Sequence, residues 1–301
     1  MPADPSLQFR PFVPADAAAV ARLYEASCRG QWPLTAADIL AQSGQRWVAA
    51  EGEVRVASVR LAPFGAGAED ALRLSLCGES RCFSGLYLTA LSAVDRRSAA
   101  GRPLCRVLGV VREDWSEQVH WFQATGFANV WQSFGAHLDL TGFDPERFAP
   151  QLKRLYLAGA EVREWQPAEG LEELYALHLQ FEEDAPSTPA IPAGHLSREE
   201  FAAALRKQRT WVVWQGPEAL AYTSFAFSGG QPDSTGTVTR RDRRGRGLAT
   251  ALKAQALTEL RQAGWTQAST GGAVANLPML RANLRLGYRP EPLWLTFERR
   301  L

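Results

Sequence analysis

The residues with the clearest chemical potential lie between positions 237 and 250, where arginines and glycines follow a strand-like pattern. A strand is expected to end near Thr239, and a helix is expected to run from about Leu248 to Ala263. The first turn of a helix has backbone amides without partners in the chain, and the helix dipole adds partial positive charge there. Gly245 and Gly247 lack a Cβ atom, so a bulky anion can approach the backbone closely. The segment therefore predicts a loop that binds a pyrophosphate.

Two common nucleotide-binding motifs do not match this segment. A Walker loop requires Gly-x-x-x-x-Gly-Lys-Ser/Thr, which is absent, and a dinucleotide-binding fingerprint requires a third glycine after the first strand of its domain. A nucleic-acid contact at positions 240–244 is disfavoured because the run is short, is interrupted by Asp242 and has no interleaved aromatic residues. A phosphate-binding loop surrounded by Arg243, Arg244 and Arg246 accounts for the charges more simply, and no nucleic-acid partner is expected.

The loop resembles a signature of the Gcn5-related N-acetyltransferase (GNAT) family, which reads Gln/Arg-x-x-Gly-x-Gly/Ala. Arg244, Gly247 and Ala249 stand at its three fixed positions. The resemblance implies acetyl-CoA as cosubstrate, with its pyrophosphate held by the loop, and it implies no metal ion. In the family, a splay after the fourth strand frees a backbone amide to meet the thioester carbonyl, and Val238 or Thr239 has that place here.

A second stretch, from Thr270 to Tyr288, resembles the pattern that follows this loop in tandem acetyltransferases with a mycothiol-synthase-like arrangement of domains. In the family, the asparagine at the place of Asn276 hydrogen-bonds the pantetheine or phosphate end of acetyl-CoA. Gly272 stands where another asparagine is usual, which departs from the pattern. The two signatures together imply cofactor contacts at Val238, Thr239, Arg240, Arg244, Gly245, Arg246, Gly247, Leu248, Ala249, Thr250, Asn276 and Asn283.

The catalytic acid and base do not carry over from the family. Many relatives have a glutamate on the fourth strand, whereas positions 234–238 hold no carboxylate. Many also have a tyrosine that protonates the departing thiolate, at the place taken here by Asn283. A base is still expected, because the amine must lose its proton before it attacks. Asp184, in an acidic stretch after the first helix of this half, is the catalytic candidate; a solvated acidic helix end is the alternative. The four histidines show no triad or metal-ligand spacing.

An internal repeat organises the chain. Four ordered matches at nearly constant separation carry it: residues 9–16 with 162–169, 34–38 with 196–200, 47–52 with 211–216, and 126–127 with 287–288. The second match reads in both copies as a capping box, with Thr35 and Ser197 as the N-caps. Each half is expected to follow the order β-α-α-β-β-β-α-β-α-β. We expect an α/β protein of two tandem GNAT-type acyl-CoA N-acyltransferase domains, residues 1–145 and 146–301, each a mixed central sheet flanked by helices.

The first copy is expected to lack a working cofactor loop. Arg81 corresponds to Arg244, but only Gly85 remains of the glycine set. Phe83 is expected to project its ring toward the place where amides would meet phosphate. Phe122 stands where the thiolate-protonating tyrosine is common, and a phenyl ring cannot donate a proton. The first domain is therefore expected to be degenerate and structural, and the second to bind acetyl-CoA.

Composition limits the classes of function. Apolar residues make up 46% of the chain and charged residues 22%, which is typical of a globular protein. Because 33 basic residues face 32 acidic ones, the net charge of +1 predicts no chain-wide attraction to nucleic acid or to an anionic membrane. No apolar run approaches the ~20 residues of a membrane span, and the N-terminus has no signal-peptide pattern. A cytoplasmic location and no membrane partner are expected.

The sequence thus predicts an N-acetyltransferase that moves an acetyl group from acetyl-CoA to a primary amine of a small molecule or peptide, by direct attack in the C-terminal domain. A non-catalytic acyl-CoA-binding or sensing protein is the alternative, because the usual glutamate and tyrosine are missing. A monomer whose tandem domains imitate a dimer and a homodimer both remain open. The residues do not identify the acceptor.

Overall fold

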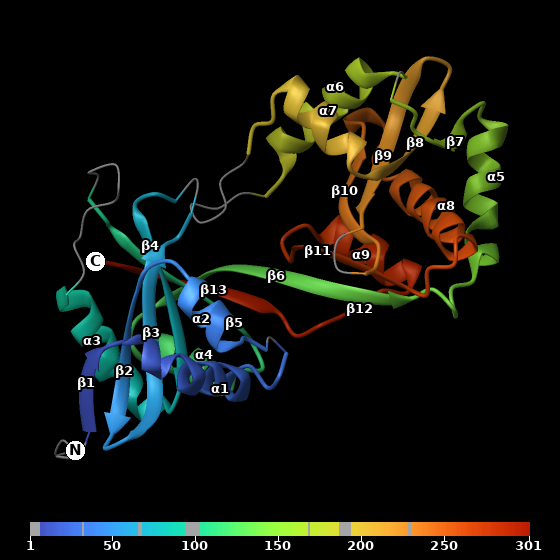
Figure 1. Cartoon of the computed structure of the whole chain (residues 1–301). Coiled ribbons are helices and arrows are strands. Elements are labelled where there is room, and N and C mark those ends of the chain that lie inside the picture. The colour runs from blue at the N-terminus through green and yellow to red at the C-terminus, as the bar shows by residue number, and fades with distance from the viewer. Residues whose placement is uncertain are drawn as a thin grey trace. The chain divides into compact units, whose positions relative to one another are not determined.

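The computed structural model of the chain describes residues 7–31, 33–65, 68–93, 103–167, 169–186, 194–227 and 230–301. These residues form two compact units, each with its own strands and helices (Figure 1). Unit 1 contains the described residues up to Gln132 together with Leu293–Leu301, and unit 2 contains the described residues between Ser133 and Pro292.

Unit 1 is a mixed sheet with helices on both faces. Its elements are β1 (Leu7–Pro11), η1 (Pro14–Asp16), α1 (Ala17–Ser27), α2 (Ala36–Ala41), β2 (Gln45–Glu51), β3 (Val54–Pro63), β4 (Ala71–Gly78), η2 (Ser80–Cys82), α3 (Phe83–Ala93), β5 (Arg106–Arg112), α4 (Ser116–Ala124), residues 128–132 of β6 (Ala128–Asp139) and β13 (Trp294–Arg300). The strand order is β1-β2-β3-β4-β5-β13, and every pair is antiparallel except β4–β5. Side chains alternate along β2, so Val48 packs with α1 and α2 while Trp47 and Ala49 enter the core on the other face.

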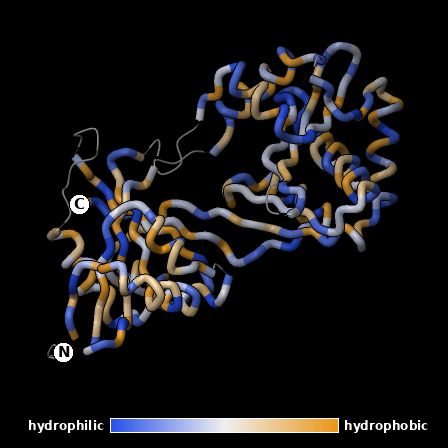
Figure 2. Tube along the Cα trace, in the orientation of Figure 1, coloured by the Kyte–Doolittle hydropathy of each residue, from blue (hydrophilic) through white to orange (hydrophobic). Residues whose placement is uncertain are grey.

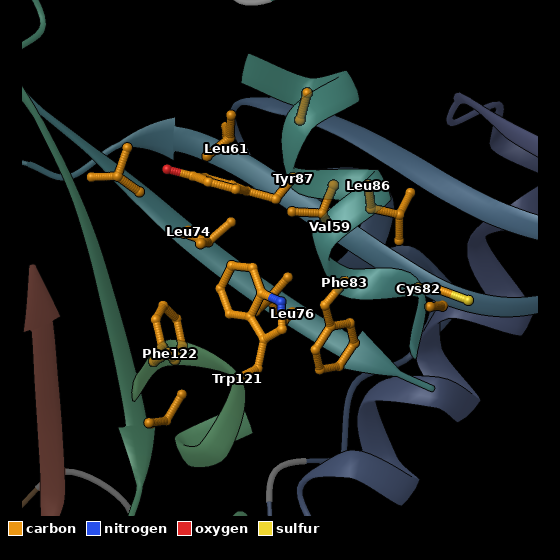
Figure 3. Close-up of a cluster of buried hydrophobic side chains, with 14 of the residues drawn as sticks. Val59, Leu61, Leu74, Leu76, Cys82, Phe83, Leu86, Tyr87, Trp121 and Phe122 are labelled. Carbon is orange, nitrogen blue, oxygen red and sulfur yellow. The ribbon is translucent and has the colours of Figure 1, made fainter. Parts of the chain in front are cut away.

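The larger core of unit 1 lies between its sheet and the helices α3 and α4 (Figure 3). The Trp121 ring meets Phe83 and Tyr87 edge-on, with centroids 6.1 and 5.5 Å apart. Phe122 stacks on Phe297 of β13 at 5.2 Å. Such aromatic pairs contribute about 0.5–1.5 kcal/mol each beyond the burial of their area. Aromatic rings therefore fill the space between α4 and the sheet in this unit.

Unit 2 repeats the arrangement. Its elements are residues 133–139 of β6 (Ala128–Asp139), η3 (Pro145–Phe148), α5 (Ala149–Leu157), β7 (Glu161–Glu164), α6 (Leu171–Asp184), α7 (Arg198–Arg206), β8 (Arg209–Gln215), β9 (Glu218–Ala226), β10 (Asp233–Thr239), η4 (Arg241–Arg243), α8 (Leu248–Gln262), β11 (Gln267–Ala273), α9 (Leu277–Leu286) and β12 (Arg289–Pro290). The strand order is β7-β8-β9-β10-β11-β6, with β12 also on β6, and only β10–β11 is parallel among these described strands.

Helices cover both faces of the unit 2 sheet (Figure 1). Val212 and Tyr222 enter the core under α6 and α7, whereas the neighbouring Trp211 bonds Glu259 of α8 on the opposite face. Hydrophobic residues follow the strands and α8 (Figure 2), and α8 is buried along most of its length. A helix buried to this extent is held firmly, so the loop that precedes it has a fixed end.

The same element order in both halves confirms the predicted fold class. The strand pairing adds a feature that the sequence did not predict. The last strand of the first half, β6, pairs with β11 of unit 2, and the last long strand of the second half, β13, pairs with β5 of unit 1. Each sheet thus takes one strand from the opposite half of the chain, and the compact units differ from the proposed division at residue 145 by this exchange of strands.

Both predicted capping boxes are present. The amide of Asp38 donates to Thr35 Oγ1 at 3.1 Å, and the amide of Glu200 donates to Ser197 Oγ at 3.3 Å. In each box the acidic side chain accepts from the N-cap amide in return, so two free amides of the first turn are satisfied. Over the described part of the chain, no helix combines the length and the apolar character that a membrane span requires.

Candidate cofactor-binding and active site

The central strands β10 and β11 of unit 2 separate soon after they meet. Their parallel pairing consists of Asp233 with Ser269 and Ser234 with Thr270, although both strands continue for several residues, to Thr239 and Ala273. β10 stays paired with β9 on its other side, with an irregularity between Ser234 and Gly236. Beyond Ser234, the edge of β10 that faces β11 therefore has no strand partner among the described residues. We call this opening the strand fork.

The loop from β10 to α8 has the geometry that the sequence predicted. The 3-10 helix η4 leads to Gly245 and Gly247, whose φ angles are 75° and 79°. Left-handed backbone of this kind favours glycine. Gly247 is the N-cap residue of α8 and offers no capping side chain to the first amides of the helix. A Cβ built on either glycine meets no atom of the described chain within 4 Å, which leaves the approach to these amides open. This is the site predicted for a pyrophosphate.

Most arginines of the loop are engaged in ion pairs. Arg240 bonds Glu218 and Asp242, and Arg241 bonds Glu183 and Asp184. The guanidinium of Arg244 donates to the carbonyl of Thr239 at 3.1 Å and to Asp184 at 2.5 Å. By contrast, Arg246 is exposed, and no acidic group of the described residues lies within ion-pair distance of it. Arg246 is thus a loop cation available to a phosphate.

Asp184 occupies a different role from the one the sequence predicted. Its carboxylate lies between the guanidinium groups of Arg241 and Arg244, at 2.6 and 2.5 Å. Hydrogen bonds from Arg241 and then Arg244 hold the pKa of this carboxyl well below its usual range. A carboxylate so strongly stabilised in its charged form is a poor proton acceptor at neutral pH. The contacts correct the assignment of Asp184 as a base and indicate that it anchors the loop to the end of α6.

Asp184→Asn tests this anchoring role. The variant should weaken binding of acetyl-CoA, the cosubstrate predicted from the sequence, by up to about tenfold, because exposed ion pairs make modest contributions. A general base would instead lower kcat by roughly 10²–10⁴-fold. Glu183→Gln is the matched control, since within the described chain Glu183 pairs with Arg241 but not with Arg244, and its loss should have a smaller effect. Isothermal titration with acetyl-CoA gives the affinity, and a large fall in kcat with unchanged affinity would restore Asp184 as a base.

The two predicted asparagines belong to the start and the last turn of α9. Asn276 is its N-cap residue, and Asn276 Oδ1 accepts from the amide of Met279 at 3.4 Å. Asn283 is buried, and its Oδ1 accepts from Lys253 Nζ at 2.7 Å while its Nδ2 has no hydrogen-bond partner among the described residues. Asn283 is therefore joined to α8 through Lys253, whereas Asn276 primarily caps its own helix.

Lys253 is a functional candidate that the sequence reasoning missed. The residue is 1% exposed, and its ammonium donates to Thr270 Oγ1 at 3.2 Å and to Asn283, and lies 4.9 Å from the centre of the Tyr288 ring. Thr270 belongs to the last residue pair before the strand fork opens. The buried amine of Lys253 therefore stands at the closed end of the fork, in surroundings of low dielectric. Within the described chain, the buried Tyr288 hydroxyl has no hydrogen-bond partner.

The sequence repeat contained a signal for the buried cluster of Lys253, Asn283 and Tyr288. Phe122 and Asn283 each stand four residues before the matched glycine, and Phe127 matches Tyr288. In unit 1 these positions are apolar, and the Phe122 ring packs so closely on Gly109 that a Cβ there would lie 2.1 Å from it. In unit 2 the same positions form a polar, partly unsatisfied network. Because buried polar groups oppose folding unless they are fully paired, the difference suggests a function that unit 1 does not share.

Lys253→Met should change how stability depends on pH. Burial lowers the pKa of Lys253 from 10.5 to about 7. Between these pH values the unfolded chain binds more protons than the folded chain, so the free energy of unfolding rises with pH by up to about 1.4 kcal/mol per unit. The variant should lack this rise, whereas Lys207→Met, at an exposed lysine after α7, should retain it. Urea unfolding across this pH range measures how the free energy of unfolding changes with pH. Equal slopes for wild type and Lys253→Met would contradict the prediction.

The structure also joins two histidines that the sequence kept apart. Glu182 of α6 lies 2.9 Å from His178 Nε2 and 2.6 Å from His195 Nδ1. His178 Nδ1 lies 3.3 Å from the hydroxyl of Tyr222 on β9. No group of three or more His, Cys, Asp or Glu residues in the described part of the chain is arranged to hold a metal ion. Glu182 thus brings two imidazoles to one carboxylate near the end of α6.

The corresponding place in unit 1 is closed. Arg81 bonds Glu51 and Glu79. The sequence predicted that the Phe83 ring projects toward the place where amides would meet phosphate, but Phe83 is fully buried in the core. A Cβ on Gly85 would lie 2.4 Å from the ring of Phe9, which explains this glycine by packing. These contacts agree with a structural unit 1.

Solved structures of similar fold include proteins named as GCN5-related N-acetyltransferases or as a tandem GNAT protein. The chain matches a GCN5-related N-acetyltransferase from Sphaerobacter thermophilus over 99% of its length and 96% of that chain, at 16% identity and a TM-score of 0.63. It matches a tandem GNAT protein from the clavulanic acid biosynthesis pathway over 98% of both chains, at 19% identity and a TM-score of 0.56. A GCN5-related glucosamine N-acetyltransferase region of a fungal multi-domain GH3 β-N-acetylglucosaminidase matches over 99% of this chain and 38% of that chain, at 15% identity and a TM-score of 0.64.

These likenesses define the fold. No family model matches the chain, and no curated protein matches it. The protein has the α/β fold of the GNAT acetyltransferases, with a mixed sheet flanked by helices. More narrowly, its two units in one polypeptide give it the tandem GNAT fold.

Proposed function

We propose that unit 2 binds acetyl-CoA and transfers the acetyl group to a primary amine of a small molecule or peptide. The observation that carries this proposal is the uncapped start of α8, opened by Gly245 and Gly247, directly beyond the strand fork. A helix start of this kind suits a pyrophosphate, and an open strand edge suits the extended arm of the coenzyme. The GNAT fold of the chain supports the same reaction class.

The residues of unit 2 divide into distinct roles in this proposal. The amides at residues 246–250 and the side chain of Arg246 hold the diphosphate. The free edge of β10 at Thr239 offers a backbone amide to the thioester carbonyl, because the neighbouring Val238 and Arg240 face β9. Such a donor typically contributes on the order of 3–4 kcal/mol to the transition state. Holding amine and thioester together contributes about 7–11 kcal/mol for well-oriented partners. Asn283, backed by Lys253, lies beside the closed end of the fork.

Acetyl-CoA titration is the first test of the proposal. We expect one acetyl-CoA per chain by calorimetry, and a higher thermal midpoint in its presence, because a ligand that binds only the folded state stabilises it. Arg246→Ala should weaken this binding by about tenfold through loss of a charge-assisted contact. Two bound molecules per chain would assign a cofactor site to unit 1 as well.

Turnover separates catalysis from binding alone. Release of free thiol is followed on mixing the protein with acetyl-CoA and a panel of amines that includes amino sugars, polyamines, amino acids and peptide N-termini. Glucosamine belongs in the panel because one solved structure of similar fold is named for it. Binding without turnover of any amine would favour a non-catalytic acyl-CoA sensor. Absence of binding would refute the site itself.

A further inference from the structure

We propose that His195, oriented by Glu182, is the general base that takes a proton from the acceptor amine; this inference rests on the proposed function. The base is the component that neither the family resemblance nor Asp184 supplies. Catalytic bases of this type consist of an accessible imidazole and a second group that fixes its orientation. In unit 2, His195 and Glu182 meet both conditions.

Glu182 is built to orient a neighbour and not to take a proton itself. Its side chain is 10% exposed, and Glu182 Oε1 accepts from the amide of Leu196 at 2.8 Å. Burial acts to raise the pKa of this carboxyl, but the Leu196 amide and the two histidines outweigh it, and the pKa lies below its ordinary value. A charged, nearly buried carboxylate therefore faces both His178 and His195.

His195 presents its second ring nitrogen to solvent. Its side chain is 75% exposed, and His195 Nδ1 lies 2.6 Å from Glu182 Oε2. If Nδ1 carries the hydrogen that is donated to Glu182, Nε2 carries the lone pair that accepts a proton. His178 lacks this freedom, because it is buried, stacks on Phe201 at 4.5 Å and contacts Tyr222 through its other nitrogen. The structure therefore distinguishes one accessible imidazole from one that supports the cluster.

The cluster adjoins the proposed cofactor site through the end of α6. Gln180 Oε1 accepts from the amide of Arg241, and Asp184 bonds Arg241 and Arg244 of the cofactor loop. Tyr222, which contacts His178, pairs in register with Val238, the neighbour of Thr239 on the free edge of β10. One turn of α6 thus holds the loop on one side and the histidines on the other.

The proposed step is a balanced acyl transfer. His195 Nε2 takes one proton from the ammonium form of the acceptor and later releases it to solvent. The neutral nitrogen then forms a bond to the thioester carbonyl carbon, and the carbon–sulfur bond breaks with its electron pair left on sulfur. The second proton lost from nitrogen balances the protonation of the thiolate. The products are the amide, the free coenzyme thiol and one proton.

The test compares His195→Ala with wild type on the full chain. We expect kcat/KM for the amine to fall by about 100-fold, the lower end of the range for general-base catalysis, with unchanged acetyl-CoA stabilisation in a thermal shift. Added imidazole should restore part of the rate, because the position is exposed, and the fall in rate at acidic pH should change. Glu182→Gln should lower the rate by about tenfold by loosening the imidazole. His137→Ala is the matched control, since His137 also contacts a glutamate, Glu291, in the same unit.

The outcomes separate this inference from the proposed function. Wild-type turnover that survives His195→Ala overturns the base assignment alone. Loss of turnover without imidazole rescue, together with a lower thermal midpoint, assigns His195 to structure and also overturns it. Acetyl-CoA binding without turnover of any amine by the wild type overturns the proposed function, and the base assignment with it.

Discussion

Gly247→Val is expected to reduce the affinity of the protein for acetyl-CoA by at least about 100-fold. The φ angle of 79° at this position is strained for any residue with a Cβ and most of all for a β-branched one, with a penalty of about 1–3 kcal/mol. The loop can relieve that strain only by moving the first amides of α8. In addition, the new methyl groups would enter the open space that a diphosphate needs. Calorimetry and a thermal-shift titration measure the loss.

Gly264→Val is the matched control for this prediction. Gly264 lies just after the other end of α8, has a φ angle of 92° and has the same open surroundings. Both variants should lower the thermal midpoint, but only Gly247→Val should abolish the shift caused by acetyl-CoA. Equal loss of the acetyl-CoA-induced shift in both variants would indicate that general destabilisation of α8 causes the effect. Undiminished affinity in Gly247→Val would place the cofactor elsewhere.

A fragment of residues 146–301 is expected not to fold, although it contains the whole second copy of the repeat. It lacks the part of β6 that pairs with β11, together with the buried side chains Phe134, Leu138, Leu140 and Phe143. Each such side chain contributes about 1.5–3 kcal/mol when buried, so their sum is comparable to the ~5–15 kcal/mol stability of a domain. The fragment also keeps β13, which has no β5 to pair with.

A fragment of residues 133–292 is the comparison for this second prediction. It retains every described strand of the unit 2 sheet and omits β13. We expect it to unfold cooperatively by circular dichroism and to be stabilised by acetyl-CoA, whereas residues 146–301 show neither property. Cooperative folding of the 146–301 fragment would mean that β6 is dispensable for unit 2.

The sequence predicted most of the fold because its signals are local. The capping boxes at Thr35 and Ser197, the glycines at 245 and 247 and the strand-to-helix order each depend on a few neighbouring residues. The repeat then extended these local signals to the whole chain. Strand exchange has no such signal. The alternating pattern of β13 predicts a strand but does not identify its partner, and the pairing with β5 is known only from the three-dimensional structure.

The candidate site was predicted in part for the same reason. The cofactor loop is continuous in sequence, so its residues could be named. The ion pairs of Asp184, the contact between Lys253 and Asn283, and the meeting of His178 and His195 at Glu182 depend on packing between elements. Spacing alone carries no information about such contacts. The exception is the comparison of Phe122 with Asn283, which the repeat already contained and which marks unit 2 as chemically distinct.

The pairing of β13 with β5 has a consequence during translation. Unit 1 begins near the N-terminus, but its sheet is completed by Leu293–Leu301, which leave the ribosome long after the rest of the unit. Until then, the edge of β5 and the apolar side chains around Phe122 lack their partner Phe297. Such an edge invites association with other chains. In the nascent chain, the sheet of unit 1 therefore stays incomplete until the residues of unit 2 have been made.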